Sequence, residues 1–344
     1  MKAAVWHAPK DIRIEEVAAP SPRPHEAMIR VESVGLCGSD VHYYLDGCIG
    51  AQVLEAPTIL GHEYAGEVVE MGSAADARLL GKRVAVEPGI PCHACEACRT
   101  GHYNVCTDMF FPGGPGCNGS LCEYMCVHAD YCFPVPQTMP PAEAALIEPV
   151  AVALHTVELA QIKPGETAAI IGLGPIGLLT AQIAKHAGIS VLHGCDLLDY
   201  RVAAAQRFGV DSAFRATDPG AAVKRILAET GGRGVDVGID CTNASAGLAM
   251  ACEVTRPAGR CVLTGISGED YDPVPVSAVR RRELVLRWCR RFRHNFPRAI
   301  ALVAGGTVDV RGLLTHTFPL EQTGEAFALL AETRDNVLKI SIDS

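Results

Sequence analysis

Four cysteines in one short segment form the most specific chemical signal of the sequence. Cys92, Cys95, Cys98 and Cys106 have the spacing C-x2-C-x2-C-x7-C. Thiolates this close together can complete a tetrahedral shell around Zn²⁺ and leave no position open for a substrate, so we expect a structural zinc site. Unpaired thiols in a Gly/Pro-rich loop are the alternative. An iron–sulfur cluster also uses four cysteines, but no other part of the chain requires an electron carrier.

A glycine-rich turn indicates a second kind of site. Gly172-Leu173-Gly174-Pro175-Ile176-Gly177 stands between an apolar run, residues 168–171, and a segment of helix formers, residues 178–186. Gly172 permits the tight turn, Gly174 lets the backbone approach a pyrophosphate, and Gly177 allows the helix to pack closely on the strand. The N-terminus of such a helix supplies N–H groups for the phosphate charge. The pattern therefore predicts a βαβ unit that binds a dinucleotide.

The acidic residue after the next strand bears on the choice of dinucleotide. A second apolar run, residues 190–195, ends at Asp196, where a ribose 2′-hydroxyl would be held. A carboxylate there repels the 2′-phosphate of NADP, so Asp196 favours NAD. Arg201 is a counter-signal, because an arginine can hold that phosphate.

Two later apolar runs read as further strands of the same sheet. Residues 235–240 and 260–265 are short and apolar, as is typical of buried parallel strands. Open α/β sheets bind ligands at the carboxyl ends of their strands. We therefore expect Cys241 and Thr242, and likewise Gly265 and Ile266, to face the nicotinamide half of the coenzyme.

Other possible metal ligands are scattered along the chain. Residues of ligand type are Cys37, His62, Glu63 and Glu148, but their spacing alone does not indicate that they share one metal site. A lone cysteine is most often a buried apolar side chain, and a glutamate near proline most often marks a helix end. Cys117, Cys122, Cys126 and Cys132 have irregular spacing in strand-like surroundings, and we interpret them as core packing.

Length and composition limit the possible classes. A chain of 344 residues is expected to form two domains, and β-branched runs before residue 140 predict a β-rich first domain. The net charge of −9 gives no general attraction to nucleic acid or to an anionic membrane. The N-terminus lacks the apolar region of a secretion signal, and the 15 cysteines are odd in number. We therefore expect a cytoplasmic protein without a disulfide framework.

The order of the motifs resembles that of one family. Gly35-Leu36-Cys37-Gly38-Ser39-Asp40, Leu60-Gly61-His62-Glu63, the four-cysteine segment, Leu146-Ile147-Glu148-Pro149 and the glycine-rich turn follow one another as in zinc-dependent medium-chain alcohol dehydrogenases. The resemblance covers nearly the whole chain and is strongest to the polyol (sorbitol/xylitol) dehydrogenase branch. It implies an α/β fold in which a Rossmann doubly wound parallel sheet, residues 151–289, accompanies a β-rich GroES-like catalytic domain, residues 1–150 and 290–344.

The resemblance also implies roles for individual residues. Cys37 and His62 would hold a catalytic Zn²⁺, with Glu63 and Glu148 in or next to its shell, which gives two Zn²⁺ per chain. Typical members of the family have cysteine where this chain has Glu148, so direct and water-mediated binding both stay open. Asp40 would orient the imidazole of His62. Ser39 would take the proton of the alcohol, His42 would pass it to solvent, and Tyr43, Arg291 and Phe292 would contact the substrate.

The resulting expectation is an NAD-dependent dehydrogenase that oxidises a secondary alcohol of a polyol to a ketose. Relatives that act on 2,3-butanediol or L-threonine share much of the pattern. A catalytically silent dinucleotide-binding protein and a zinc-ribbon nucleic-acid binder are alternatives from other classes. The arginine-rich segment 280–293 could suggest a nucleic-acid patch. Because the chain is acidic and shows neither aromatic interleaving nor a binding motif, we expect a solvated or subunit-contact face there. The resemblance implies a homo-oligomer, a tetramer or a dimer.

Overall fold

The computed structural model describes all residues from Met1 to Ser344 and divides them into two compact units. Unit 1 comprises residues 1–148, 296–305 and 310–344, and unit 2 comprises residues 149–295 and 306–309. Residues 290–295, which we had expected in the catalytic domain, therefore belong to unit 2. One reason is that the buried Asn295 donates a hydrogen bond from Nδ2 to the carbonyl oxygen of Ala151, at 3.0 Å.

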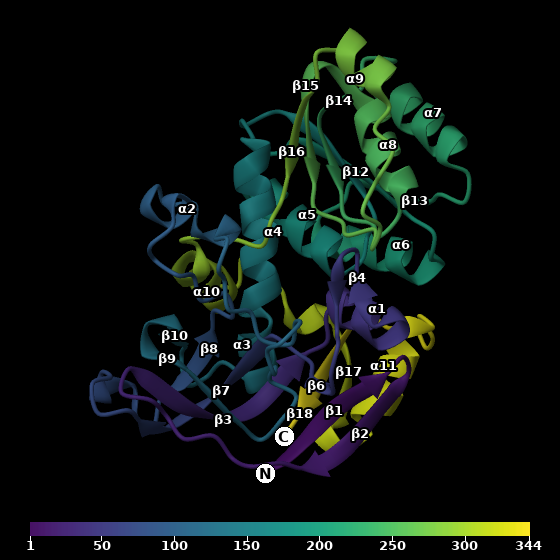
Figure 1. Cartoon of the computed structure of the whole chain (residues 1–344). Coiled ribbons are helices and arrows are strands. Elements are labelled where there is room, and N and C mark those ends of the chain that lie inside the picture. Colours follow the sequence, from purple (N-terminus) through teal and green to yellow (C-terminus); the bar gives the residue numbers. More distant parts are fainter. The chain divides into compact units, whose positions relative to one another are not determined.

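Unit 2 contains a six-stranded parallel sheet with the strand order β13-β12-β11-β14-β15-β16 (Figure 1). From the central strand β11, the chain first adds β12 and β13 on one side and then adds β14, β15 and β16 on the other side. This is the strand order of a doubly wound sheet, so the prediction is confirmed. Its strands are β11 (Thr167–Ile171), β12 (Val191–Asp196), β13 (Ser212–Arg215), β14 (Val235–Asp240), β15 (Thr255–Leu263) and β16 (Val285–Trp288). Its helices are α5 (Pro175–His186), α6 (Asp199–Ala205), α7 (Pro219–Glu229), α8 (Ser245–Val254) and α9 (Val276–Arg281), and most of α4 (Ile147–Ala160) belongs to it as well.

The central strand of unit 2 is buried because its sequence is apolar, and it ends where a glycine follows. Ala168 to Ile171 of β11 are at most 3% exposed, since neighbours cover both faces of a parallel strand. Gly172 then adopts a φ of +93°, a left-handed conformation that favours glycine. Pro175 begins α5, where its missing N–H is not needed. The chain therefore turns directly from strand to helix at the predicted position.

Unit 1 is built mainly from antiparallel strands. A seven-stranded sheet has the order β10-β8-β7-β3-β18-β17, with β9 also paired to β3, and a three-stranded sheet has the order β2-β1-β6. The strands are β1 (Lys2–Ala8), β2 (Asp11–Glu16), β3 (Glu26–Gly35), β4 (Cys48–Ile49), β5 (Gln52–Val53), β6 (Thr58–Ile59), β7 (Glu63–Met71), β8 (Arg83–Val86), β9 (Tyr124–His128), β10 (Cys132–Pro134), β17 (Leu314–Pro319) and β18 (Lys339–Asp343). The helices are α1 (Gly38–Asp46), α2 (Glu96–Arg99), α3 (Pro141–Ala145), α10 (Phe296–Ala304) and α11 (Thr323–Ala331).

The register of three neighbouring strands brings distant segments together. Gly35 at the end of β3 lies opposite Glu63 at the start of β7, and on its other side it lies opposite Ser341 of β18. The C-terminal strand thus inserts beside the first long strand of the chain. Ile340 and Ile342 of β18 are fully buried in the same core as the β3 side chains. None of the helices combines the length and apolar character needed to cross a bilayer.

Candidate active site

The four-cysteine segment forms a closed lobe in unit 1. Backbone hydrogen bonds between Ile90 and Phe110, at 3.0 Å in both directions, close its base. The sulfur atoms of Cys92, Cys95, Cys98 and Cys106 all lie within 4.8 Å of one another. The short helix α2 begins directly after Cys95 and carries Cys98 in its single turn. The structure therefore brings the four predicted ligands together.

The surroundings of these sulfur atoms suit thiolates that bind a metal. Backbone N–H groups of Ala94 and Cys95 donate to Sγ of Cys92 and lower the pKa of this thiol. The N–H of Asp108 donates to Sγ of Cys106 at 3.4 Å. Because only the deprotonated sulfur binds zinc well, such donors favour the ligand form. The residues present fit a tetrahedral Zn²⁺ with no open position.

A second group of ligand types assembles at the ends of two strands. The donor atoms of Cys37, His62 and Glu63 lie within 4.8 Å of one another. Cys37 follows β3 and is the N-cap of α1, whereas Glu63 is the first residue of β7. His62 and Glu63 are buried. Cys37 is distant in sequence from the adjacent residues His62 and Glu63, and it meets them because β3 and β7 are paired.

Asp40 connects the two segments that carry this group. Its Oδ2 accepts a hydrogen bond from the N–H of Cys37 at 3.1 Å, and its Oδ1 accepts one from the N–H of Gly61 at 3.3 Å. Oδ1 also lies 3.3 Å from Nδ1 of His62. Burial by itself lowers the pKa of His62, but the charge and hydrogen bond of Asp40 outweigh it and raise that pKa well above its usual value. Asp40 thus orients the imidazole through Nδ1, which leaves Nε2 as the ring nitrogen that would bind a metal after losing its proton.

The carboxylate of Glu63 pairs with Lys339 through both of its oxygens. Oε1 accepts a hydrogen bond from Nζ of Lys339 at 2.7 Å, and Oε2 lies 2.6 Å from the same nitrogen. A buried carboxylate is costly unless it is paired, and this ammonium group provides the partner. A carboxylate oxygen of Glu63 is also one of the donor atoms that lie within 4.8 Å of those of Cys37 and His62. One thiolate, one imidazole and this carboxylate are a donor set that Zn²⁺ accepts.

Four other residues that the resemblance assigns to this centre or its substrate lie in the same unit, namely Glu148, Ser39, His42 and Tyr43. Glu148, at the start of α4, is buried, and its charge acts on Lys339, although it is not one of the three clustered donors. Ser39 and His42 are half-buried on α1, one turn apart. Tyr43 of the same helix is buried and packs in the core of unit 1.

The glycine-rich turn of unit 2 is held by the aspartate at the end of β12. Oδ2 of Asp196 accepts a hydrogen bond from the N–H of Leu173 at 2.8 Å, and Oδ1 accepts one from Leu198 at 3.0 Å. Nη1 of Arg201 lies 3.6 Å from Oδ2. A Cβ atom at Gly174 would lie 3.5 Å from the same guanidinium. Asp196 and Arg201 therefore both stand beside the turn that the sequence assigns to the coenzyme.

The ends of the next two strands lie on the same edge of that sheet. The N–H of Cys241 donates to the carbonyl oxygen of Ile171, and Thr242 donates from its hydroxyl to Asp240 at 2.8 Å. Burial raises the pKa of Asp240 to about 6. Gly265 packs on the backbone of Thr242, and the neighbouring Ile266 is exposed. Arg291 and Phe292 come after β16 in unit 2, with Phe292 buried.

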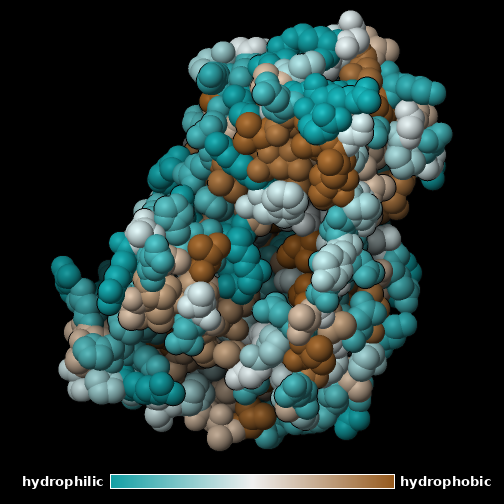
Figure 2. Space-filling view, turned by 45° about the horizontal axis from the view of Figure 1, so that its top comes forward, coloured by the Kyte–Doolittle hydropathy of each residue, from teal (hydrophilic) through white to brown (hydrophobic).

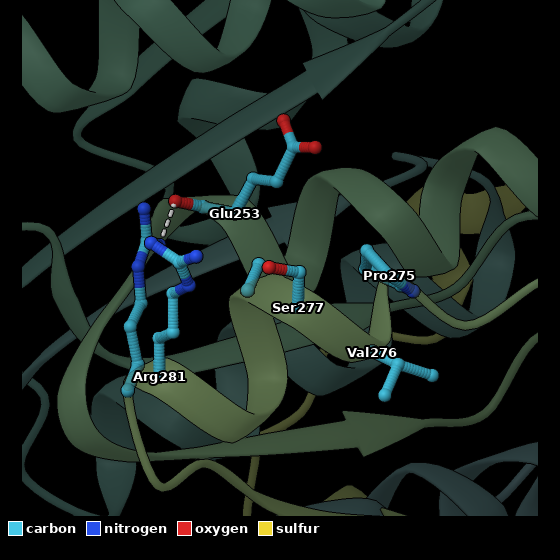
Figure 3. A pocket seen from close by; sticks show the side chains of 7 residues that line it. Glu253, Pro275, Val276, Ser277 and Arg281 are labelled. Carbon is cyan, nitrogen blue, oxygen red and sulfur yellow. Dashed lines mark hydrogen bonds between the residues drawn. The ribbon is translucent and has the colours of Figure 1, made fainter.

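A surface hollow of about 560 Å³ lies elsewhere on unit 2. Glu253, Pro275, Val276, Ser277 and Arg281 line it (Figure 3), and Arg282 beside them donates to the carbonyl oxygen of Glu253 at 2.6 Å. The hollow lies beside the amino end of β15. Because parallel sheets bind ligands at the opposite edge, this hollow is not the coenzyme site.

Comparison with known proteins identifies the family. Residues 23–137 match the family described as alcohol dehydrogenase GroES-like domain, and residues 175–305 match that described as zinc-binding dehydrogenase. Sorbitol dehydrogenase of Bacillus subtilis is 36% identical over 99% of this chain and 97% of its own length. The chain belongs to the zinc-dependent medium-chain alcohol dehydrogenases. It falls in their polyol dehydrogenase branch, and its fold, a GroES-like domain with a Rossmann domain, is the one that the resemblance implied.

Solved structures of this family are close to the chain throughout. 2R,3R-butanediol dehydrogenase of Bacillus subtilis superposes with a TM-score of 0.88 at 32% identity, covering 100% of this chain and 99% of that one. A dehydrogenase from Escherichia coli with NADH and a zinc-binding dehydrogenase from Sinorhizobium meliloti with NADP each give a TM-score of 0.90 at 28% identity, with the same coverage. The protein is therefore an oxidoreductase of the zinc and nicotinamide dinucleotide type.

One residue of the centre was missed by sequence reasoning. Lys339 is only 4% exposed and contacts Glu63, yet the two are 276 positions apart. Burial alone lowers the pKa of its ammonium group, but Glu63, Cys37 and Glu148 outweigh this and raise that pKa. A signal did exist: Lys339 interrupts the apolar run Val337-Leu338-Lys339-Ile340, and lysine is almost never fully buried unless it is paired.

Proposed function

We propose that this dehydrogenase oxidises a secondary hydroxyl group of a polyol to a ketone, with NAD as the hydride acceptor. The observation that carries the proposal is the clustered set Cys37, His62 and Glu63 in a chain that is 36% identical to a sorbitol dehydrogenase. A zinc ion bound there would polarise the alcohol oxygen and make its proton more acidic. A second zinc ion in the four-cysteine lobe would be structural.

The residues around the centre would handle the proton and the substrate. Ser39 and His42 are one helical turn apart on α1, so a proton taken by the hydroxyl of Ser39 has a neighbouring acceptor in the imidazole of His42. Both side chains are half-buried, which gives His42 a path to solvent. By family resemblance, Tyr43, Arg291 and Phe292 would contact the substrate, and Glu148 would bind the metal directly or through water.

The choice of NAD rests on the carboxylate of Asp196. This group is buried at the end of β12, where its negative charge opposes a 2′-phosphate. Arg201 lies 3.6 Å from that carboxylate and neutralises part of the carboxylate charge. This pairing makes the guanidinium group of Arg201 less available to hold a 2′-phosphate. Gly172, Gly174, Pro175, Ile176 and Gly177 would surround the pyrophosphate, and Cys241, Thr242, Gly265 and Ile266 the nicotinamide.

A butanediol is the main competing substrate, because a 2R,3R-butanediol dehydrogenase is 32% identical to this chain. The deciding experiment measures NADH formation with sorbitol, xylitol, 2,3-butanediol and L-threonine at equal concentrations, with NAD and with NADP. We expect the largest kcat/KM with a polyol and NAD. A kcat/KM at least ten times larger for butanediol or threonine would reject the polyol assignment and leave the dehydrogenase assignment intact.

Removal of one ligand tests the metal centre itself. Cys37→Ala should lower kcat by at least about a thousandfold, because the hydroxyl loses the charge that stabilises its deprotonated form. Metal analysis should find two zinc ions in the parent and one in the variant, while NAD binding and the circular dichroism spectrum stay unchanged. A variant that keeps the parent rate would remove Cys37 from the mechanism.

A further inference from the structure

Lys339 carries a buried positive charge that the proposed reaction does not use. Its side chain is 5% exposed and that of Glu63 is 1% exposed. Nζ donates to the carbonyl oxygen of Leu36 at 2.8 Å and to Oε1 of Glu63 at 2.7 Å. Burying an ammonium group costs several kcal/mol unless excellent contacts compensate it, on the order given for buried ion pairs. A buried charge of this free-energy cost is expected to have a role in the surrounding site.

The two acceptors of Lys339 adjoin two different ligand segments. Leu36 immediately precedes Cys37, and Glu63 immediately follows His62. One ammonium group of β18 therefore ties the end of β3 to the start of β7 at the point where the metal ligands leave the sheet. Movement of either segment would break one of the two hydrogen bonds. The side chain thus fixes the spacing between Cys37 and the His62–Glu63 pair.

Gly35 provides the space into which Glu63 is held. A Cβ atom at this position would lie 2.3 Å from Oε2 of Glu63, closer than any real contact. Lys339 donates to Oε1 and lies 2.6 Å from Oε2, and the missing side chain of Gly35 leaves room for Oε2. The carboxylate is therefore constrained from two sides into one orientation. In this orientation a carboxylate oxygen of Glu63 lies within 4.8 Å of the donor atoms of Cys37 and His62.

We propose that Lys339 is a positioning residue of the catalytic metal centre, which holds Glu63 and the segment before Cys37 in the arrangement that binds the zinc ion. This inference rests on the proposed function, because it presumes a metal at Cys37, His62 and Glu63. The charge of Lys339 also suits the site. A thiolate and the two carboxylates Glu63 and Glu148 carry one negative charge more than Zn²⁺ neutralises, and the ammonium group restores neutrality.

The alternative is that Lys339 only stabilises the fold as the partner of a buried carboxylate. Removal of one member of such a pair destabilises a protein in either case, because the other charge is left unpaired. Thermal stability therefore does not distinguish the two roles. Two other quantities distinguish the roles: the affinity of the catalytic site for metal and the ligand environment of the bound metal. A purely structural residue leaves both unchanged once the chain is folded.

The test compares the full-length parent with Lys339→Met, Glu63→Gln and the double variant. Zinc affinity is measured by competition with a chromogenic chelator, and cobalt-substituted protein gives the visible spectrum of the bound metal. Lys339→Met should bind catalytic zinc about 10–100 times more weakly, as is typical when an outer partner of a ligand is lost, and Glu63→Gln, which loses the charge of a ligand, should bind it at least as weakly. The double variant should be weakened by less than the product of the two single effects, since Lys339 acts in part through Glu63. The cobalt spectrum of Lys339→Met should resemble that of Glu63→Gln.

An exposed ion pair of the same unit is the matched control. Nζ of Lys2 lies 2.7 Å from Glu321, and both side chains are about half exposed, so Lys2→Met should leave zinc affinity unchanged. Lys339→Met with parent affinity and spectrum, or a double variant weakened by the product of both single effects, would overturn the proposal. If Lys339→Met does not fold, the neutral pair Glu63→Gln with Lys339→Gln replaces it. A pair with the same zinc affinity and spectrum as Glu63→Gln alone then overturns the proposal equally, because Lys339 would not hold the segment before Cys37. A parent with only one zinc ion contradicts the proposed function instead.

Discussion

Each of the two expected ligand sites has a buried aspartate that binds the backbone of the site rather than the ligand alone. Asp40 accepts N–H groups from both segments that carry the metal ligands. Asp196 accepts the N–H groups of Leu173 and Leu198, on either side of the coenzyme position. Each carboxylate thus connects two backbone segments through charge-assisted hydrogen bonds. These two residues therefore combine structural support with charge at a binding site.

Replacement of Asp196 should change the coenzyme preference. Asp196→Ala removes the repulsion of a 2′-phosphate and frees Arg201, so we expect the ratio of kcat/KM for NADP to that for NAD to rise by roughly 10–100-fold, the equivalent of one charged hydrogen bond. Asp199→Ala is the matched control, because Asp199 is exposed and pairs with Arg215. Steady-state kinetics with both coenzymes measure the ratio, and an unchanged ratio would exclude Asp196 from coenzyme selection.

At the scale of elements, the four-cysteine lobe depends on contacts at its base. Apart from the short helix α2 and a single turn of 3₁₀-helix, the lobe has little regular structure, and the bridge between Ile90 and Phe110 closes it. Tyr103 within the lobe donates to Oε1 of the buried Glu87 after β8, at 2.7 Å. Because the lobe has so little regular structure and its four thiols face one another, we expect it to require the metal to stay ordered.

Loss of one cysteine of the lobe should affect stability before catalysis. Cys98→Ala should release the structural zinc and expose residues 91–109 to proteolysis, because structural zinc contributes folding free energy directly. Limited proteolysis and zinc content measure this effect, with Cys117→Ala as the control at a cysteine outside both metal groups. Two zinc ions per chain in Cys98→Ala would contradict the assignment of the lobe.

Glu87 gives the same element a dependence on pH. Burial raises the pKa of its carboxyl group to about 7, although the hydrogen bond from Tyr103 opposes the rise. The folded chain therefore keeps a proton that the unfolded chain loses above pH of about 4.3. This contribution to stability falls as pH increases from about 4.3 to about 7 and stays low above that.

Glu87→Gln should abolish this contribution to the pH dependence. We expect the variant to be more stable relative to the parent at pH 8 than at pH 5, by about 1–3 kcal/mol, since each unit of pKa shift corresponds to about 1.4 kcal/mol. Urea unfolding at both values measures the difference. Tyr103→Phe should have the opposite effect and steepen the dependence. Equal differences at the two pH values would show that Glu87 stays charged in the folded chain.

At the scale of the whole molecule, one edge of the parallel sheet is open. Strand β16 pairs only with β15, and its side chains Val285 and Trp288 are 46% and 59% exposed. A hydrophobic patch surrounded by hydrophilic side chains is visible in the upper part of Figure 2. Exposed edges of this kind pair readily with another strand, and pairing with the same edge of a second copy would satisfy two-fold symmetry. We propose this edge as a contact of the expected homo-oligomer.

A charge placed on this edge should weaken assembly. Trp288→Arg should move the mass measured by light scattering from a multiple of 36.4 kDa toward that of the single chain. Leu80→Arg is the control, because Leu80 is 54% exposed in unit 1. A Trp288→Arg variant with the parent mass would show that β16 does not form the contact.

The sequence by itself determined the features whose parts are close together in the chain. The βαβ unit was predictable because strand, glycine turn and helix follow one another, and their periodicity is local. The four cysteines were predictable because they lie within 15 residues of one another. The roles of Cys37, His62 and Glu63 followed only from the resemblance, since no local pattern joins them.

Only the tertiary structure decided which distant residues meet. The pairing of β18 with β3 brings Lys339 to Glu63 and places Gly35 opposite both β7 and β18. Side-chain alternation along a strand predicts which face a residue occupies, but not which strand lies beside it. The sequence thus indicated zinc and dinucleotide chemistry. Strand pairing between segments at opposite ends of the chain fixed the geometry in which that chemistry is expected to occur.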